Sequence, residues 1–251
     1  MDGLAPWKWS LINVTLVSLI SLVGVFTLAL RQERIEQITH LLVSLAVGAL
    51  FGNAILHLIP ESFSGQFSPL LSSLLILAGI LLFFIIEKFL RWRHCHVPLS
   101  SGHLHPFVTL NLMSDAVHNF IDGVLIAASF SVNVSLGFST TLAIALHEIP
   151  QEIGDFGVLV RGGLTPRRAL AFNFFSALAA VVGAVVVLLV GTEFKEPVKY
   201  LIPVTAGGFL YIAGADLIPE LHHEVRFKSS LLQLCLMLLG IAVMVLLTFL
   251  E

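Results

Sequence analysis

Two apolar stretches of the sequence each carry polar side chains near their centres. The first reads NLMSDAVHNFIDGVLI from residue 111, and the second reads TLAIALHEIPQEIGDFGVLV from residue 141. Residues three or four apart share one face of an α-helix, so each stretch would present its polar groups together. The nine groups are Asp115, His118, Asn119, Asp122, His147, Glu148, Gln151, Glu152 and Asp155.

The residue types in these stretches favour a transition metal over other ligands. Imidazole and carboxylate side chains without a thiolate suit a borderline divalent first-row cation such as Zn²⁺. Ca²⁺ or Mg²⁺ would favour an all-oxygen cage, and a nucleotide would need a glycine-rich loop that is absent here. A hydrogen-bonded network between helices would explain a single histidine or aspartate, but it explains the whole set poorly.

Composition places these polar stretches in a membrane protein. Aliphatic, aromatic and cysteine residues make up 57% of the 251 residues, only 12% are charged, and the mean hydropathy is +0.97. A soluble domain would carry about a quarter charged residues. Each charged group at the centre of a membrane helix costs about 2.5–3.5 kcal/mol, so these groups must face one another, water or a bound ion. The net charge of −3 gives no reason to expect nucleic acid as a partner.

The hydropathy pattern predicts eight membrane spans in one domain over residues 1–251, since a span needs about 20 apolar residues. The predicted spans are Leu11–Leu30, Ile38–Ile59, Pro69–Ile86, Phe107–Phe130, Leu136–Val160, Ala169–Gly191, Tyr200–Ile218 and Leu231–Leu250. With the N-terminus outside, the inner segments hold all but Lys8, Lys195 and Lys199 of the 13 Lys and Arg residues, as the positive-inside rule requires. We therefore predict an all-α polytopic membrane protein with both termini outside.

The predicted spans differ in polarity, and two of them resemble each other. Spans one, three, six and eight contain no charged residue or histidine, so they should face lipid around a core of the other four. LHLIPES (56–62) ends span two and ADLIPEL (215–221) ends span seven. Because these two spans run in opposite directions, their similarity indicates an inverted repeat in a 3+2+3 arrangement, with the site between the repeats near the midplane.

The paired polar motifs resemble those of a known transporter family. HNFIDG (118–123) followed by HEIPQEIGDF (147–156) is similar to the motifs of the ZIP (Zrt-/Irt-like) divalent metal transporters, especially the subfamily with HNxxDG and HExPHE. The resemblance covers essentially the whole chain, and it implies metal ligands at His118, Asn119, Asp122, His147, Glu148 and Gln151, with Glu152 beside them. Gln151 stands where that subfamily usually has a second histidine. No acid occurs between Asp155 and Glu193 to complete a two-metal centre, so we expect one principal metal ion.

The resemblance also implies a function, which is import of Zn²⁺ toward the cytosol by alternating access, with the metal as substrate and no organic cofactor. Fe²⁺, Mn²⁺ and Cd²⁺ stay open as alternative substrates. Further acids and histidines are candidate pathway residues, namely His57, Glu61, Asp115, Asp155, Asp216, Glu220, His222 and His223. The loop over residues 91–106 is either metal-binding or simply solvated, and it holds His94, His96, His103 and His105.

Two other function classes are compatible with the residues. An intramembrane zinc-dependent metalloenzyme is the first, since His147 and Glu148 begin like the H-E-x-x-H motif of zinc proteases. Gln151 in place of the second histidine and Pro150 within the turn argue against it. A metal sensor or scaffold that rests on the histidine loop is the second. The expected partners are a divalent metal ion and the lipid bilayer, with a homodimer left open, and the expected location is a bacterial cytoplasmic membrane.

Two local expectations concern the surroundings of the polar stretches. Pro150 lacks an N–H group and should therefore kink the fifth span beside the polar residues. Asn173 and Ser176 in the sixth span are interpreted as helix-packing residues, because small polar side chains commonly join membrane helices.

Overall fold

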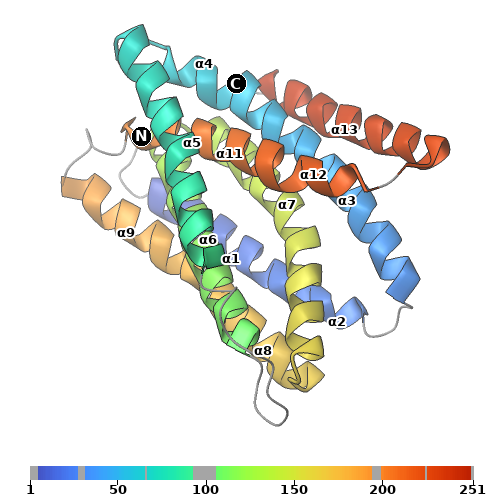
Figure 1. The fold of residues 1–251 in the computed structure, drawn as a ribbon. Coiled ribbons are helices and arrows are strands. Elements are labelled where there is room, and N and C mark those ends of the chain that lie inside the picture. The colour runs from blue at the N-terminus through green and yellow to red at the C-terminus, as the bar shows by residue number, and fades with distance from the viewer. Residues whose placement is uncertain are drawn as a thin grey trace.

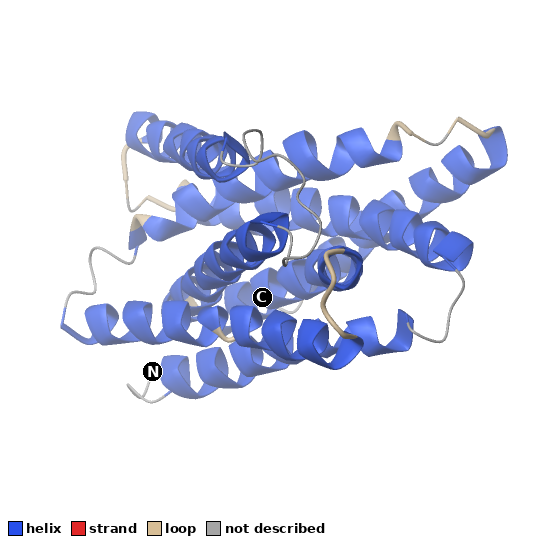
Figure 2. Ribbon diagram, turned by 60° about the horizontal axis from the view of Figure 1, so that its bottom comes forward, coloured by secondary structure: helices blue, strands red, loops and turns tan. Residues whose placement is uncertain are grey.

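The computed structural model describes residues 5–27, 32–65, 67–92, 106–193, 199–223 and 225–249. Within these ranges the backbone is helical apart from short turns, and no strand is present (Figure 2). The predicted histidine loop, with His94, His96, His103 and His105, lies outside the described residues.

The helices lie across one another in a single bundle (Figure 1). The segment η1 is a 3₁₀-helix, η2 and η4 are π-helices, and the others are α-helices. In chain order they are α1 (Ala5–Ile20), η1 (Ser21–Val23), α2 (Gly24–Thr27), α3 (Gln32–Asn53), η2 (Ala54–Leu58), α4 (Ile59–Ser62), α5 (Pro69–Trp92), α6 (Pro106–Val132), α7 (Val134–Arg161), α8 (Pro166–Ala177), α9 (Ala179–Glu193), α11 (Leu201–Tyr211), η4 (Ile212–Leu217), α12 (Ile218–Leu221) and α13 (Phe227–Thr248).

Six helical segments of the described chain are long and apolar enough to cross a membrane. They are Ala5–Phe26, Gln37–Ser62, Pro69–Lys88, Pro166–Gly191, Leu201–Leu221 and Phe227–Thr248. The other two predicted spans fall on α6 and α7, which have 27 and 28 residues but carry the polar clusters that lower their hydropathy. The chain is therefore a multi-pass membrane protein, and the count of eight spans stays a prediction.

The burial of these segments follows their polarity. Of the predicted polar spans, Gln37–Ser62 and Leu201–Leu221 each contain an apolar 18-residue stretch that is 67% and 53% buried, whereas the corresponding stretches of the apolar segments Pro69–Lys88 and Phe227–Thr248 are only 17% buried. The exposed faces of these apolar helices are lined by large side chains such as Leu74, Leu81 and Leu238. Apolar side chains that face outward are compatible with lipid, so the bundle has a polar centre and an apolar wall.

Close backbone contacts at glycine hold the helices in two groups. In the first group α6 packs against α9, with α1, α7 and α8 alongside, and in the second α3 packs against α13 and α5 against α11 (Figure 1). A Cβ atom at Gly123 would lie 1.8 Å from the carbonyl oxygen of Ala180, so no larger side chain fits there. Similar close approaches join the two helix pairs of the second group, at Gly48 with Gly240 and at Gly79 with Gly207. The two groups meet chiefly where α3 contacts α7.

A single residue separates α6 from α7, which brings the two polar stretches side by side as antiparallel neighbours. Asn133 ends α6 and caps α7, because its side-chain oxygen accepts a hydrogen bond of 2.7 Å from the backbone N–H of Leu136. The helix α7 then runs on through Pro150 to Arg161 as one continuous element. The expected kink at Pro150 therefore does not interrupt the helix.

The two similar LIPE segments share an unusual backbone. LHLIPES passes from the π-helix η2 into α4, and ADLIPEL passes from the π-helix η4 into α12. Pro60 and Pro219 each follow a π-helical turn, and neither can donate a hydrogen bond to the carbonyl four residues before it. The missing donor is a physical reason for a disturbed turn in both segments, and the inverted repeat itself stays a prediction.

Candidate metal site

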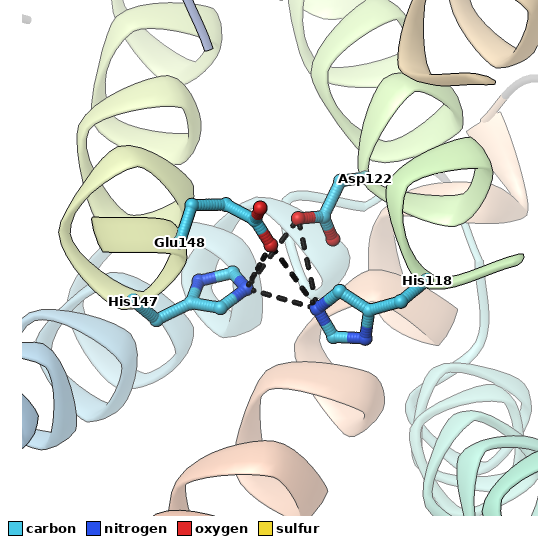
Figure 3. A group of neighbouring side chains, drawn as sticks. All are labelled: His118, Asp122, His147 and Glu148. Atoms are coloured by element: carbon cyan, nitrogen blue, oxygen red, sulfur yellow. Dashed lines mark hydrogen bonds and ion pairs between the residues drawn. The ribbon is translucent and has the colours of Figure 1, made fainter. Parts of the chain in front are cut away.

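Four side chains from α6 and α7 converge in the centre of the bundle, and we call them the central cluster. They are His118 and Asp122 of α6 and His147 and Glu148 of α7 (Figure 3). The His118 Nε2 and His147 Nε2 atoms lie 3.2 Å apart. Glu148 Oε1 lies 3.4 Å from His118 Nε2 and 3.5 Å from His147 Nε2. Asp122 Oδ2 lies 3.4 Å from His147 Nε2 and 3.9 Å from His118 Nε2.

One backbone contact orients an imidazole of the central cluster. His147 Nδ1 lies 3.2 Å from the carbonyl oxygen of Ala143, which can only accept a hydrogen bond. A neutral His147 that donates from Nδ1 has a bare Nε2 lone pair, and this atom points at the other three residues. Metal-binding histidines are commonly held in this way by a carbonyl behind the ring.

The central cluster is buried and rich in oxygen atoms without hydrogen-bond partners. The side chains of Asp122, His147 and Glu148 are 0%, 1% and 1% exposed, whereas His118 is 22% exposed. Within the described part of the chain, both oxygens of Asp122 and Oε1 of Glu148 have no hydrogen-bond partner. Buried carboxylates without donors are costly, and a cation between them would remove that cost.

The spacing of the donor atoms matches a tetrahedral metal site. Zn–N and Zn–O bonds of about 2.0–2.2 Å place neighbouring ligand atoms of a tetrahedron about 3.4 Å apart. The five nitrogen–nitrogen and nitrogen–oxygen distances within the central cluster run from 3.2 to 3.9 Å, and all four donor atoms lie within 4.8 Å of one another. The arrangement can therefore supply two imidazole nitrogens and two carboxylate oxygens to one divalent ion.

Two other predicted ligands have protein partners of their own. Asn119 Nδ2 donates a hydrogen bond of 2.9 Å to Asp115 Oδ1, and the Glu152 carboxylate accepts a hydrogen bond from Asn173 of α8. The Glu152 side chain is not among the four donors of the central cluster. Each of the two also keeps a buried oxygen without a hydrogen-bond partner among the described residues, Asn119 Oδ1 and Glu152 Oε1.

The sequence interpretation missed how α8 contributes to the site. Asn173 and Ser176 were interpreted as packing residues, but Asn173 contacts Glu152 and the Ser176 hydroxyl donates to Asp115 Oδ2. Their spacing of three residues places both on one face of α8. That spacing in an otherwise apolar span was the available signal, and it would have pointed to the carboxylates of the neighbouring helices.

A cavity of about 530 Å³ reaches the central cluster from one side. It touches His118 and is lined on the site's own helices by Asp115, Gln151 and Asp155, and Glu220 of α12 lines it as well. Asp155 Oδ1 accepts a hydrogen bond of 3.0 Å from Asn111 Nδ2. Gln151, Asp115, Asp155 and Glu220 therefore share one aqueous space with the exposed edge of His118.

Four other predicted pathway residues, His57, Glu61, His222 and His223, do not line this cavity. His57 is 2% exposed and its Nε2 lies 3.0 Å from the carbonyl oxygen of Met244 in α13. Glu61 is half-buried in α4, and His222 and His223 are exposed beyond α12. The backbone of Asp216 lies in the π-helix η4, and its side chain lies outside the described structure.

Comparison with known proteins gives consistent matches over the whole chain. The family model described as ZIP Zinc transporter matches residues 4–106 and 93–248. Zinc transporter ZIP13 of Pongo abelii is 36% identical over 269 residues, covering 98% of this chain and 79% of the relative. Zinc transporter SLC39A7 of Rattus norvegicus is 29% identical over 351 residues, with 100% of this chain and 74% of the relative covered. Metal cation symporter ZIP8 of Homo sapiens is 30% identical over 302 residues, with 89% and 64% covered.

These relatives bear on two of the sequence expectations. All three are named as transporters or symporters, so the comparisons give no support to the metalloenzyme alternative. They come from mammals, and the expected bacterial cytoplasmic membrane is therefore unsupported. The match of the family model to nearly all of the sequence, together with the level of identity to ZIP13, shows that the chain belongs to the ZIP zinc transporter family.

Proposed function

We propose that this chain carries Zn²⁺ across a membrane, with His118, Asp122, His147 and Glu148 as the ligands of one transported ion. The observation that carries the proposal is the set of donor distances, 3.2 to 3.9 Å, which fits the edges of a tetrahedron around zinc. Gln151 lies beside His118 in the cavity and is a further candidate contact for the ion. Asn119 and Glu152 are proposed to have a supporting role next to these ligands, since each has a hydrogen-bond partner of its own, Asp115 and Asn173 respectively.

Alternating access is supported by the asymmetry of the site. The cavity opens the central cluster on the side of Asp115 and Asp155. On the other side, buried apolar residues such as Ile126 and Ile144 follow along α6 and α7. A transporter must expose its site to one side at a time, and this arrangement corresponds to one of the two states. Because the ligands all belong to the first helix group, movement of that group against the second would transfer them as a unit.

The direction of transport follows from the proposed topology. Eight spans with both termini outside would place the N-terminal end of α6 and the C-terminal end of α7 at the cytosolic face. The cavity, with Asp115, Asp155 and Glu220, would then be the route by which the ion leaves toward the cytosol. Carboxylates that line a polar route can hold a cation briefly and release it, as conduction through membrane proteins requires.

Uptake of zinc by proteoliposomes containing the purified protein tests this function. Glu148→Gln and His147→Ala each remove a donor of the central cluster, and each should reduce zinc uptake at least about tenfold, since one lost ligand costs more than about 1.4 kcal/mol. Thr141→Val is the matched control on the same helix, because its buried hydroxyl donates only to the Gly137 carbonyl. Normal uptake by both ligand variants would refute the site.

Uptake experiments with the same vesicles identify the preferred metal ion and distinguish transport from the remaining function classes. Competition by Fe²⁺, Mn²⁺ and Cd²⁺ against zinc ranks the alternative substrates, because ligand type alone does not set selectivity. Binding of zinc without transport by the wild-type protein would favour a sensor, and it would overturn the transport proposal.

Labelling with a membrane-impermeant thiol reagent tests the topology. In a background without the native cysteines, Ser64→Cys should react from outside and Thr165→Cys only from the cytosolic side. Both positions are exposed and lie between helices, and the φ of −65° at Thr165 is one that cysteine adopts without strain. The reverse pattern would exchange the entrance and the exit.

A further inference from the structure

Three buried polar side chains meet on the side of the central cluster that faces away from the cavity, and we call them the distal polar cluster. Asn53 of α3 donates from Nδ2 to Thr140 Oγ1 of α7 at 3.4 Å, and Thr140 Oγ1 donates to Ser129 Oγ of α6 at 3.0 Å. Ser129 Oγ in turn donates to the Leu125 carbonyl at 2.9 Å. All three side chains are 0% exposed.

The distal polar cluster is in register with the central cluster. Ser129 follows Asp122 by seven residues, and Thr140 precedes His147 by seven residues. Seven residues make about two helical turns, a rise of about 10.5 Å, with a drift of only about 20° around the axis. The two hydroxyls therefore stand on the same helix faces as two residues of the central cluster, one step further from the cavity.

The oxygen atoms of the distal polar cluster keep capacity to bind a cation. Each hydroxyl donates once and accepts at most once, so each oxygen retains a lone pair. Asn53 Oδ1 is buried and has no hydrogen-bond partner within the described residues. A buried amide oxygen without a donor is unfavourable in a finished structure, and it indicates a group that has a second use.

The distal polar cluster also joins the two helix groups. Asn53 is the last residue of α3, directly before the π-helical turn Ala54–Leu58, whereas Ser129 and Thr140 belong to the group that holds the central cluster. π-helical turns within helices often occur at functional positions. A hydrogen bond across the boundary between the groups would break when they separate on this side.

We propose that Asn53, Ser129 and Thr140 form an access site for the incoming divalent cation, in which neutral oxygens replace part of its water shell before it reaches His147 and Asp122. The inference rests on the proposed transport function. Neutral amide and hydroxyl oxygens bind a divalent ion weakly, so the ion passes on to the imidazoles and carboxylates two turns away. Such a site must attract the ion enough to admit it and release it fast enough to sustain transport.

The test measures zinc uptake and zinc binding in the same variants. Asn53→Ala and Thr140→Val should each raise the KM for zinc uptake about fivefold, the size of effect expected when one polar contact is lost. The Kd of the purified protein for zinc should stay unchanged, because the central cluster is reached through the cavity. Asn53→Asp places a charged oxygen at the same position, so it should lower both KM and kcat as the ion is held longer.

The control is Asn13→Ala, since Asn13 is a buried asparagine of α1 that donates to the Trp9 carbonyl of its own helix. Unchanged KM in both Asn53→Ala and Thr140→Val would overturn the access site, even with lower expression. An Asn53→Asp variant whose KM is not lower than that of the wild-type protein would overturn it too, and this comparison stands if the alanine variant fails to fold. Absence of uptake by the wild-type protein is a separate outcome, which refutes the transport function itself.

Discussion

Replacing Asp122 by asparagine should stabilise the metal-free protein while it weakens zinc binding. Asp122 and Glu148 are 0% and 1% exposed, and their facing oxygens lie within 4.8 Å. Two unit charges at that separation repel by about 3.5 kcal/mol at an effective dielectric constant of about 20. Asparagine removes this repulsion, and its amide can donate to Glu148 Oε1, which has no hydrogen-bond partner among the described residues and only the longer contacts to the two imidazoles.

The two effects can be read from one thermal unfolding experiment in detergent. Relief of the repulsion should raise the unfolding midpoint of the metal-free protein by several degrees, at about 2–4 °C per kcal/mol for a chain of this length. Loss of one of four donors should weaken zinc affinity at least about 100-fold, or about 2.7 kcal/mol. The rise in midpoint that zinc produces in the wild-type protein should therefore shrink.

Asp155→Asn is the matched control for this prediction. The carboxylate of Asp155 already has a partner in Asn111, at 3.0 Å, and it lies outside the central cluster. Its neutralisation should leave the metal-free midpoint nearly unchanged and preserve the rise with zinc. A lower metal-free midpoint in Asp122→Asn, or a rise with zinc equal to that of the wild-type protein, would refute the reasoning.

Three further substitutions test packing and support of the site. Gly123→Leu should lower the free energy of unfolding by the cost of an overpacked contact, about 1–3 kcal/mol. Gly157→Ala, whose Cβ would meet nothing within 4 Å, should be neutral or stabilising. Thermal unfolding measures both effects. Asn173→Ala should lower stability by about 1–3 kcal/mol because Glu152 loses its donor, and the same unfolding curves check it. Gln151→His adds an imidazole beside the cavity and should tighten zinc binding or change the order of metals in competition assays; an unchanged order would show that this position does not contact the ion.

Helical spacing in the sequence predicted that the histidines of the two polar stretches lie close together, while their role as metal ligands stays a prediction. The expectation that His118 and His147 lie at one depth on adjacent antiparallel helices agrees with Nε2 atoms 3.2 Å apart. This succeeded because the two helices are joined through Asn133 alone, so residues near equal distance from that turn must come together. The family assignment, which rested on the paired motifs of the sequence, was confirmed by the comparisons.

Contacts between distant helices could not be predicted from spacing alone. The sequence does not show which helices pack against α8. It therefore could not predict that Ser176 is a partner of Asp115 and that Asn173 is a partner of Glu152. The π-helices were missed for a different reason. A proline such as Pro60 indicates a disturbed helix, but whether the backbone kinks, breaks or widens depends on what surrounds it.

The charges of the site favour a single transported ion over a bridged pair. With neutral imidazoles, the central cluster carries two negative charges, from Asp122 and Glu148, and these balance one divalent cation. A second ion would need a second set of ligands, and the described residues hold one such group only, although Glu152 Oε1 and Asn119 Oδ1 are buried without hydrogen-bond partners. Asp115 already accepts hydrogen bonds from Asn119 and Ser176, so binding a metal there would require these donors to be given up in a buried place. We therefore infer that one ion moves at a time, and that the neighbouring carboxylates act on it only as it leaves through the cavity.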